Sequence, residues 1–254
     1  MQNNTFSRLF VGQNVVTLKQ VDSTNNFLKN ELAKSTPLCE GTVILAEEQF
    51  AGRGQANNTW YSEPGKNLTF SLLLSPAFLN PEKQFLLNKS LSIAINDTLT
   101  TIIGNKAKIK WPNDIYYDND KLGGVLIENI LRGNSIKYSI IGIGLNINQT
   151  QFRSDIKNVT SLKKILHRDY DIKDVLYQLC SSIEQRYLQL RAGSAELIDR
   201  DYLKGLYKLN ENHRFRIGGK EREGVIKGIS ENGSLEVLID GELRRYGFKE
   251  IVFV

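Results

Sequence analysis

The sequence predicts an α+β protein in two parts, and three features of its 254 residues predict this. Short β-type runs fill the middle of the chain, amphipathic helical segments flank them, and the last 45 or so residues consist of short strands broken by glycine turns. Because domains usually take roughly 100 to 200 residues, this length fits one sizeable domain and a small companion. We therefore expect a large domain over residues 1–209 and a small one over residues 210–254.

The composition is typical of a soluble globular protein, with 41% hydrophobic and 24% charged residues. The longest apolar runs, such as residues 70–74, are far shorter than the roughly 20 residues that span a bilayer, and the first 18 residues do not resemble a signal peptide. We therefore expect a cytoplasmic protein. The net charge of +5 suits an anionic ligand or an acidic partner, and it equally suits a solvated basic surface.

Cysteine and histidine are too scarce for several kinds of site. Cys39 and Cys180 cannot form a disulfide framework and lack the spacing of a zinc or redox site, so we expect buried thiols. His167 and His213 are far apart in the sequence, which leaves little material for a histidine metal site or a Ser/His/Asp triad. Any catalysis must depend on other groups.

The first half of the chain alternates strand and helix patterns. Strands are expected over residues 14–18, 41–47 and 67–74, and helices over residues 26–34 and 81–103. The segment 49–65 is polar, rich in glycine and without a period, so it is expected to form a long functional loop. Ser23 and Thr24 precede the first helix, where they could cap it, contact an anion, or do both.

The second half contains a sheet, two helices and the terminal strands. Strands are expected over residues 107–111, 114–117, 124–130 and 135–141, and helices over residues 171–190 and 194–206. The later strands are expected over residues 215–217, 223–229, 235–239, 242–246 and 250–253. Glycine turns separate them, and this pattern predicts a small closed β-barrel of the SH3-like kind.

Four motifs carry the chemical information. The loop Ala51-Gly52-Arg53-Gly54-Gln55 has the flexible backbone and the charge needed to close over a phosphorylated ligand, although an ordinary surface turn would also explain it. It lacks the third glycine of a dinucleotide fingerprint, and the chain has no P-loop motif. Lys110-Trp111-Pro112-Asn113-Asp114 and Lys121-Leu122-Gly123-Gly124 are more specific, because they combine rare composition with a mobile cation beside exposed backbone.

The fourth motif is Gly142-Ile143-Gly144-Leu145-Asn146. Structural explanations remain for the last three motifs: an Asx turn for Asn113-Asp114 and strand bends for the glycine pairs. Each motif would need its own coincidence, so a common ligand site is the better interpretation.

Taken in order, these motifs resemble those of the biotin protein ligase family over nearly the whole chain. The matching pieces are Ser23-Thr24-Asn25, Gln49 with Gly52-Arg53-Gly54, Trp60, the motifs at 110–114, 121–124 and 142–146, and the C-terminal strands. The resemblance implies a mixed β-sheet flanked by helices, a biotin/lipoate ligase-like catalytic domain, and a small C-terminal SH3-like domain. It also implies an ATP-dependent enzyme that joins biotin to AMP and then transfers the biotinyl group to a lysine of a biotin carboxyl carrier protein.

The resemblance further implies which residues act. The expected biotin-binding residues are Ser23, Thr24, Asn25, Gln49, Gly52, Arg53, Gly54, Gln55, Lys121 and Gly124. The expected nucleotide-binding residues are Arg53, Trp60, Asn113, Asp114, Lys121 and Asn146. Lys121 and Arg53 are the expected catalytic residues, because they can neutralise the repulsion between the biotin carboxylate and the α-phosphate of ATP. Asp114 is the candidate ligand for Mg²⁺.

Two departures from the family pattern matter. Many relatives carry an arginine where this chain has Gln55 and a basic run where it has Ala56-Asn57-Asn58, so we hypothesise that this loop retains the adenylate less tightly. Only about 20 residues precede Ser23, too few for the DNA-binding winged helix of some members, so we expect no DNA binding. We expect no membrane partner either, and sheet edges could pair two subunits as a homodimer.

Two other functions remain as alternatives. A lipoate protein ligase would share the core and the adenylate chemistry, but the Gly-Arg-Gly and Lys-Trp-Pro-Asn-Asp motifs and the terminal strands favour biotin. A non-catalytic module could recognise a peptide or nucleic acid through its SH3-like end. The basic residues there lack the interleaved aromatic platform of a single-strand binder.

Overall fold

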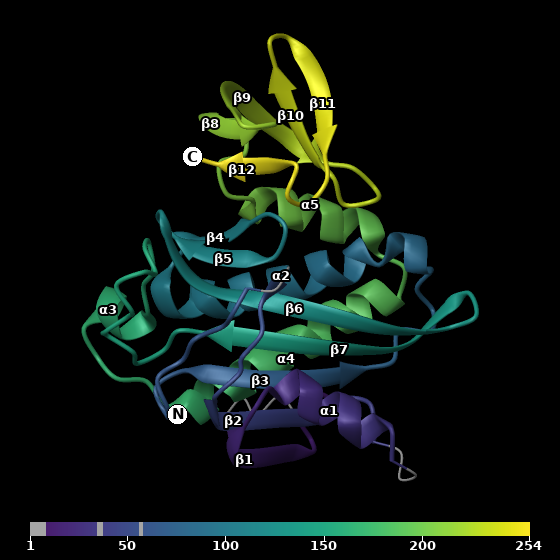
Figure 1. The fold of residues 1–254 in the computed structure, drawn as a ribbon. Helices are drawn as coiled ribbons and strands as arrows, with labels where there is room; N and C mark the ends of the chain where they lie inside the picture. Colours follow the sequence, from purple (N-terminus) through teal and green to yellow (C-terminus); the bar gives the residue numbers. More distant parts are fainter. Residues whose placement is uncertain (1–8, 35–37, 56–57) are drawn as a thin grey trace.

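The chain folds around a seven-stranded β-sheet with helices on both faces (Figure 1). The structure is a computed structural model and describes residues 9–34, 38–55 and 58–254. Residues 1–8 of the N-terminal stretch and Ala56-Asn57 of the loop therefore lie outside the described residues. The strand order is β1-β2-β3-β7-β6-β5-β4, with β1 and β2 parallel and the other neighbouring pairs antiparallel. The prediction of a mixed sheet flanked by helices is confirmed.

The strands of this sheet overlap all the predicted ones. They are β1 (Val15–Val21), β2 (Val43–Gln49), β3 (Leu68–Leu74), β4 (Ala107–Lys110), β5 (Asp114–Tyr117), β6 (Asp120–Arg132) and β7 (Ser135–Leu145). The two longest, β6 and β7, extend beyond their predicted bounds because glycines continue the ladder: Gly123 pairs with Leu145, and Gly124 with Gly144. The glycine pairs therefore lie within continuous strands, and β6 has a bulge beside Gly123, where its register with β5 shifts.

The helices are α1 (Thr24–Leu32), α2 (Phe85–Ile103), α3 (Leu162–Leu166), α4 (Ile172–Arg191) and α5 (Ala195–Gly205). The predicted helix over residues 81–103 begins later, because Pro81–Lys83 form a separate 3₁₀ turn, η2, whose start is capped by the side chain of Asn80. Helix α3 is not predicted from the sequence, since five residues are too few to show a helical period.

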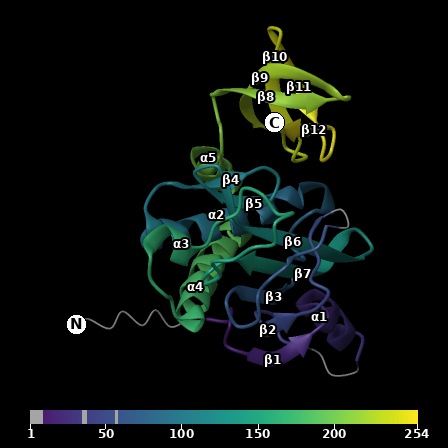
Figure 2. The same ribbon diagram turned by 60° about the vertical axis from the view of Figure 1, so that its left-hand side comes forward.

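The two faces of the sheet are covered unequally (Figures 1 and 2). Helices α2 and α4 lie on one face, where the larger hydrophobic core joins side chains such as Leu72 and Ile141. On the other face α1 packs on β2, β3 and β7, and its Leu28 buries a small cluster with Leu73 and Ile140. Because side chains alternate between faces along a strand, the rest of this second face is free to line a site.

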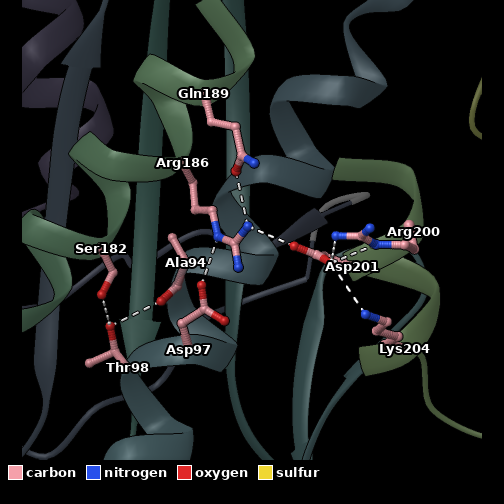
Figure 3. Close-up of polar contacts among 9 residues, drawn as sticks. All are labelled: Ala94, Asp97, Thr98, Ser182, Arg186, Gln189, Arg200, Asp201 and Lys204. Carbon is pink, nitrogen blue, oxygen red and sulfur yellow. Dashed lines mark hydrogen bonds and ion pairs between the residues drawn. The ribbon is translucent and has the colours of Figure 1, made fainter. Parts of the chain in front are cut away.

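A polar network ties α2, α4 and α5 together (Figure 3). Arg186 of α4 donates to Asp97 of α2 at 2.7 Å and to Asp201 of α5 at 2.9 Å. Arg200 and Lys204 also pair with Asp201, from within α5. The Arg186 side chain is only 17% exposed, so losing either carboxylate would leave a mostly buried charge underpaired. The network therefore fixes α5, which leads the chain into its C-terminal part.

The C-terminal part is a second, antiparallel sheet that lies beyond α5 (Figure 1). Its strands are β8 (Asn212–Ile217), β9 (Lys220–Ile229), β10 (Leu235–Ile239), β11 (Glu242–Tyr246) and β12 (Ile251–Phe253). The prediction of a closed barrel is wrong: within residues 212–253, all of which the structure describes, β11 and β12 lie at opposite edges and do not pair. The short segment 247–250 carries the chain across to β8, which pairs with every residue of β12. The division at residue 210 stays a prediction.

A hydrogen bond joins the second sheet to the first. The indole of Trp111 donates to the carbonyl of Gly233, in the β9–β10 turn, at 2.9 Å. Gly233 has a φ of +88° and lies against Phe85 of α2, where an added Cβ would stand 2.5 Å from the ring. Only glycine satisfies both the backbone conformation and the close approach.

Two further expectations concern the cysteines and membranes. Cys180 is buried on α4, as expected, but Cys39 is exposed in the segment before β2, so the prediction of a buried thiol is wrong there. Across the described part of the chain, no helix combines the length and apolar character needed to cross a bilayer.

We expect Trp111→Phe to lower the free energy of unfolding by about 1–3 kcal/mol more than the same change at Trp60, because the buried Gly233 carbonyl loses its donor. Urea unfolding followed by circular dichroism would measure it. Trp60→Phe is the matched control, since the Trp60 indole nitrogen has no hydrogen-bond partner among the described residues. Equal losses of unfolding free energy in both variants would contradict a stabilising role for the hydrogen bond between Trp111 and Gly233.

Candidate functional site

A pocket opens on the sheet face that α1 leaves uncovered. Strands β3, β6 and β7 contribute to it, together with the start of α1, the loop after β2 and the start of β5. Including the part open to solvent, its space is about 480 Å³.

Most of the predicted site residues line this pocket. They are Ser23, Thr24, Asn25, Gln49, Arg53, Gly54, Trp60, Asn113, Asp114, Lys121 and Gly124. Residues from distant parts of the sequence are therefore gathered around one space, as the resemblance implies.

Three predicted residues lie elsewhere. Gly52 is buried behind the pocket, where an added Cβ would stand 2.4 Å from the Trp60 carbonyl oxygen. Gln55 lines cavities between the two sheets, beside Trp111 and Phe248. Asn146 is buried and its side-chain amide donates to the carbonyl of Thr160 at 3.0 Å. None of the three lines the pocket itself, so direct ligand contacts from them stay predictions.

Glycines shape the floor of the pocket. An added Cβ at Gly142 would stand 2.6 Å from the Asn25 amide oxygen, and one at Gly144 would stand 2.4 Å from the Trp60 ring. Gly142 and Gly144 are two residues apart on β7 and so project to the same face. The sequence analysis selected only Asn146 from this motif, whereas the structure places the two glycines in the pocket wall.

Other lining residues were not predicted. They are Thr69, Phe70, Val125, Leu126 and Ile143, in addition to the two glycines. One signal was present in the sequence: Thr69 and Ser71 alternate within an otherwise apolar strand and pair with Gly144 and Gly142. Small polar residues repeated with a period of two mark one strand face as different from the core.

A chain of hydrogen bonds connects the polar groups at one part of the pocket. The Gln49 side-chain oxygen accepts from the Thr24 backbone nitrogen at 2.7 Å and from the Thr24 hydroxyl at 2.9 Å. The Ser71 hydroxyl lies 2.7 Å from the Thr24 hydroxyl and 2.5 Å from the Asn25 amide oxygen. We call Thr24, Asn25, Gln49 and Ser71 the polar cluster. Such neutral, mostly buried groups suit a neutral polar part of a ligand.

Ser23 adjoins this cluster at the N-cap position of α1. Its backbone is extended, as at most N-caps, but its side chain makes no capping hydrogen bond within the described residues. Capping by the hydroxyl is therefore not realised, and Ser23 lines the pocket instead.

Two cations face the same space, each beside a carboxylate. The Lys121 ammonium lies 2.6 Å from Asp114, and the Arg53 guanidinium lies 2.5 Å from Glu128. The cationic side chains are 35% and 39% exposed, so solvent weakens both ion pairs and an anionic ligand can compete for the cations. Lys121 is held through its backbone, which donates to Asn158 and accepts from Thr160.

Two buried polar atoms of the pocket lack partners. Within the described residues, neither the Trp60 indole nitrogen nor the Thr69 hydroxyl makes a hydrogen bond, and both residues line the pocket. A buried polar group without a partner is destabilising by about 1–3 kcal/mol. Both atoms are therefore available to a ligand.

Lys110, which begins the motif at residues 110–114, lies beside the pocket, between the two sheets. Burial lowers the pKa of its ammonium, the Asp114 carboxylate opposes that shift, and the Lys121 ammonium adds to it. The Lys110 nitrogen donates to the Tyr116 hydroxyl at 3.0 Å and lies 4.8 Å from the centre of the Phe253 ring. Lys110 therefore connects the first sheet to β12.

The described residues contain no group of three or more His, Cys, Asp or Glu side chains placed to hold a metal ion. Asp114 is a single carboxylate, paired with Lys121. Protein Mg²⁺ sites often use only one or two carboxylates and complete their coordination with substrate phosphates. The pocket therefore fits a cation that arrives with a phosphate ligand, not one held by protein groups alone.

Residues 17–146 match the model of the biotin/lipoate A/B protein ligase family, and this segment contains every residue that lines the pocket. The chain belongs to the biotin/lipoate A/B protein ligase family.

Individual relatives extend the similarity beyond that segment. The bifunctional ligase/repressor BirA of Bacillus subtilis is 31% identical over 240 residues, which cover 92% of this chain and 69% of that protein. The biotin–[acetyl-CoA-carboxylase] ligase of Paracoccus denitrificans is 28% identical over 228 residues, or 86% of this chain and 91% of that one. The biotin protein ligase of Aquifex aeolicus, solved in complex with biotin and ATP, aligns with a TM-score of 0.80 and 29% identity over 95% of this chain and 99% of that one.

We expect Thr69→Val to weaken ligand binding about fivefold, because a valine of the same shape removes a pocket hydroxyl that has no partner among the described residues. Calorimetric titration with biotin and with a stable biotinyl-adenylate analogue would measure it. Thr69→Ser keeps the hydroxyl and should bind like the unmodified chain. If Thr69→Val binds both ligands normally but unfolds more easily, the hydroxyl has a structural role instead.

Proposed function

We propose that the chain is a biotin protein ligase: it activates biotin with ATP to form biotinyl-5′-AMP, then transfers the biotinyl group to a lysine of a biotin carboxyl carrier protein. The observation that carries the proposal is that one pocket joins the polar cluster to the cations Arg53 and Lys121. Biotin has matching parts, since it combines a neutral ureido head with an apolar body and a terminal carboxylate. The Aquifex aeolicus relative, which was solved with biotin and ATP, supports the same pair of substrates.

The polar cluster explains why the proposed substrate is biotin and not lipoate. In our proposal Ser23, Thr24 and Gln49 contact the ureido head, while Asn25 is bonded to the cluster through Ser71. A site built from buried donors and acceptors rejects a ligand that cannot pair with them, because those groups would then lose their partners. Lipoate has no ureido group, so this site favours biotin over lipoate.

In the first step a carboxylate oxygen of biotin attacks the α-phosphorus of ATP, and the bond from that phosphorus to the pyrophosphate oxygen breaks. Both reactants are anions, so they must be brought together against their repulsion. Arg53 and Lys121 are placed to neutralise this charge, and Lys121 must exchange its contact with Asp114 for a ligand oxygen. Trp60 and Asn113, which also line the pocket, are our proposed contacts to the nucleotide.

In the second step the amine of the carrier lysine attacks the biotinyl carbonyl carbon, and AMP leaves with the bonding electron pair. Lys121 would stabilise the phosphate as it departs. No covalent enzyme intermediate is required, because the adenylate is already an activated acyl group. The amide of Asn146 holds Thr160, whose backbone pairs with Lys121, so Asn146 supports the catalytic lysine indirectly.

Mg²⁺ is expected to accompany ATP, and Asp114 remains our proposed ligand for it. The ion would supply charge neutralisation at the phosphates. The carrier protein of a biotin-dependent carboxylase is the proposed partner. The absence of DNA binding, a possible homodimer and a cytoplasmic location stay predictions.

We expect the chain to catalyse biotin-dependent exchange of pyrophosphate into ATP, with far less exchange when lipoate replaces biotin. Lys121→Ala should lower the exchange rate by roughly 10²–10³, because a charged donor to the transition state is lost. Lys163→Ala is the control, since Lys163 pairs with Asp169 outside the pocket. Exchange with neither acid would overturn the proposal.

We expect Gln55→Arg to slow release of biotinyl-5′-AMP several-fold, because an added positive charge near the pocket mouth attracts the adenylate phosphate. Gln55 lies close enough to share a cavity with Asp114 and Lys121. Ala56 and Asn57, which belong to the same hypothesis, lie outside the described residues. Stopped-flow measurement of the off-rate would test it, with Gln55→Asn as an uncharged control, and equal off-rates would refute it.

A further inference from the structure

Glu128 connects the polar cluster to the loop arginine. One of its carboxylate oxygens, Oε2, accepts from the Asn25 side-chain nitrogen at 2.8 Å and from the Arg53 guanidinium at 2.5 Å. Glu128 lies on β6, two residues beyond the lining residue Leu126 and therefore on the same strand face. No motif in the sequence points to a role for this glutamate.

We propose that Glu128 is a positioning residue for adenylation: it fixes the Arg53 guanidinium beside the pocket through the same oxygen that Asn25 holds. The proposal rests on the biotin ligase function proposed above and assigns Glu128 no contact with substrate. It makes the position of Arg53 depend on the polar cluster that receives the head of biotin.

Asn25 is the rigid end of this connection. Its side chain is buried, and its amide oxygen lies 2.5 Å from the Ser71 hydroxyl. Gly142 packs directly against the same amide, so any larger residue there would displace it. With its oxygen held by Ser71, the amide must turn its nitrogen toward Glu128. The carboxylate is thereby anchored to the sheet and not only to a surface loop.

Arg53 is the exposed end. Its backbone forms a bridge with Thr59, whereas its side chain is 39% exposed. A guanidinium has five N–H donors in a planar fork, so one bond to Glu128 leaves others for a carboxylate or phosphate. Because the two side chains of the ion pair are 39% and 27% exposed, the pair should contribute little to overall stability. Its effect should be on geometry, and small displacements of a charged group can slow the chemical step strongly.

The other cation of the pocket is held differently. Lys121 pairs with Asp114, which follows Asn113 in a separate motif, and its backbone is bonded to residues 158 and 160. Glu128 is therefore the carboxylate through which the polar cluster reaches a catalytic cation. Substitutions of Glu128 should therefore affect Arg53, whereas substitutions of Asp114 should affect Lys121.

The test compares Glu128→Gln with Glu128→Ala in biotin-dependent pyrophosphate exchange. The glutamine oxygen can still accept from Asn25 but carries no charge to hold Arg53, so we expect kcat to fall about tenfold while the KM for biotin stays nearly unchanged. The alanine variant loses both contacts, so kcat should fall and the KM for biotin should also rise. In an Arg53→Ala background, Glu128→Gln should have no further effect on kcat. Asp169→Asn, which breaks the remote pair with Lys163, is the control and should leave both constants unchanged.

A second measurement does not depend on the proposed function. Trypsin cleaves after Arg53 only when that side chain is free to enter the protease, so Glu128→Gln should speed cleavage at Arg53 in the ligand-free chain. If Glu128→Gln is cleaved faster but the unmodified chain shows no biotin-dependent exchange, the ligase function is refuted and the contact between Glu128 and Arg53 is retained. Unchanged cleavage, or a kcat loss that is additive with Arg53→Ala, would overturn the positioning role. A higher kcat or tighter biotin binding in Glu128→Gln would also overturn it, because Glu128 would then compete with the ligand for Arg53.

Discussion

Gly142 and Gly144 stand at alternate positions of β7, on the sheet face that α1 covers only in part. With no side chain at either position, Asn25 and the Trp60 ring can approach the backbone to distances that a Cβ would forbid. The polar cluster and the aromatic wall of the pocket both depend on this approach. A single methyl group at Gly142 would displace Asn25, and through it Glu128 and Arg53.

The charges of the pocket are balanced before any ligand arrives. Arg53 faces Glu128, and Lys121 faces Asp114, at 2.5 and 2.6 Å. This arrangement limits the repulsion between two nearby cations in the free protein, and partial exposure keeps each pair weak enough to yield to an anion. An anionic substrate therefore competes with existing carboxylates and does not enter a pocket of unpaired charge.

The second sheet is attached to the first beside the pocket. Trp111 binds Gly233 in the β9–β10 turn, and Lys110 lies against Phe253 of β12, while Asn113 and Asp114 of the same motif line the pocket. One short motif therefore carries both the contact between the sheets and part of the site. The Arg186 network fixes α5 from the other side, so the second sheet is held at both its entry and its turn (Figure 3).

The sequence by itself determined the order of most helices and strands, because periodicity is a property of neighbouring residues. Most of the pocket residues were expected from the resemblance to the family. Ser23, Arg53, Asn113 and Lys121 could be placed in one site through the resemblance, without knowing their distances. Only the tertiary structure decided that the terminal sheet stays open, that the glycine pairs continue β6 and β7, and that Asn146 lies behind the pocket. It alone revealed Thr69, Ser71 and Glu128, which are ordinary strand residues whose roles come from partners far away in the chain. Such roles depend on which strand face a residue takes and on what stands opposite, and the packing of the whole sheet sets both.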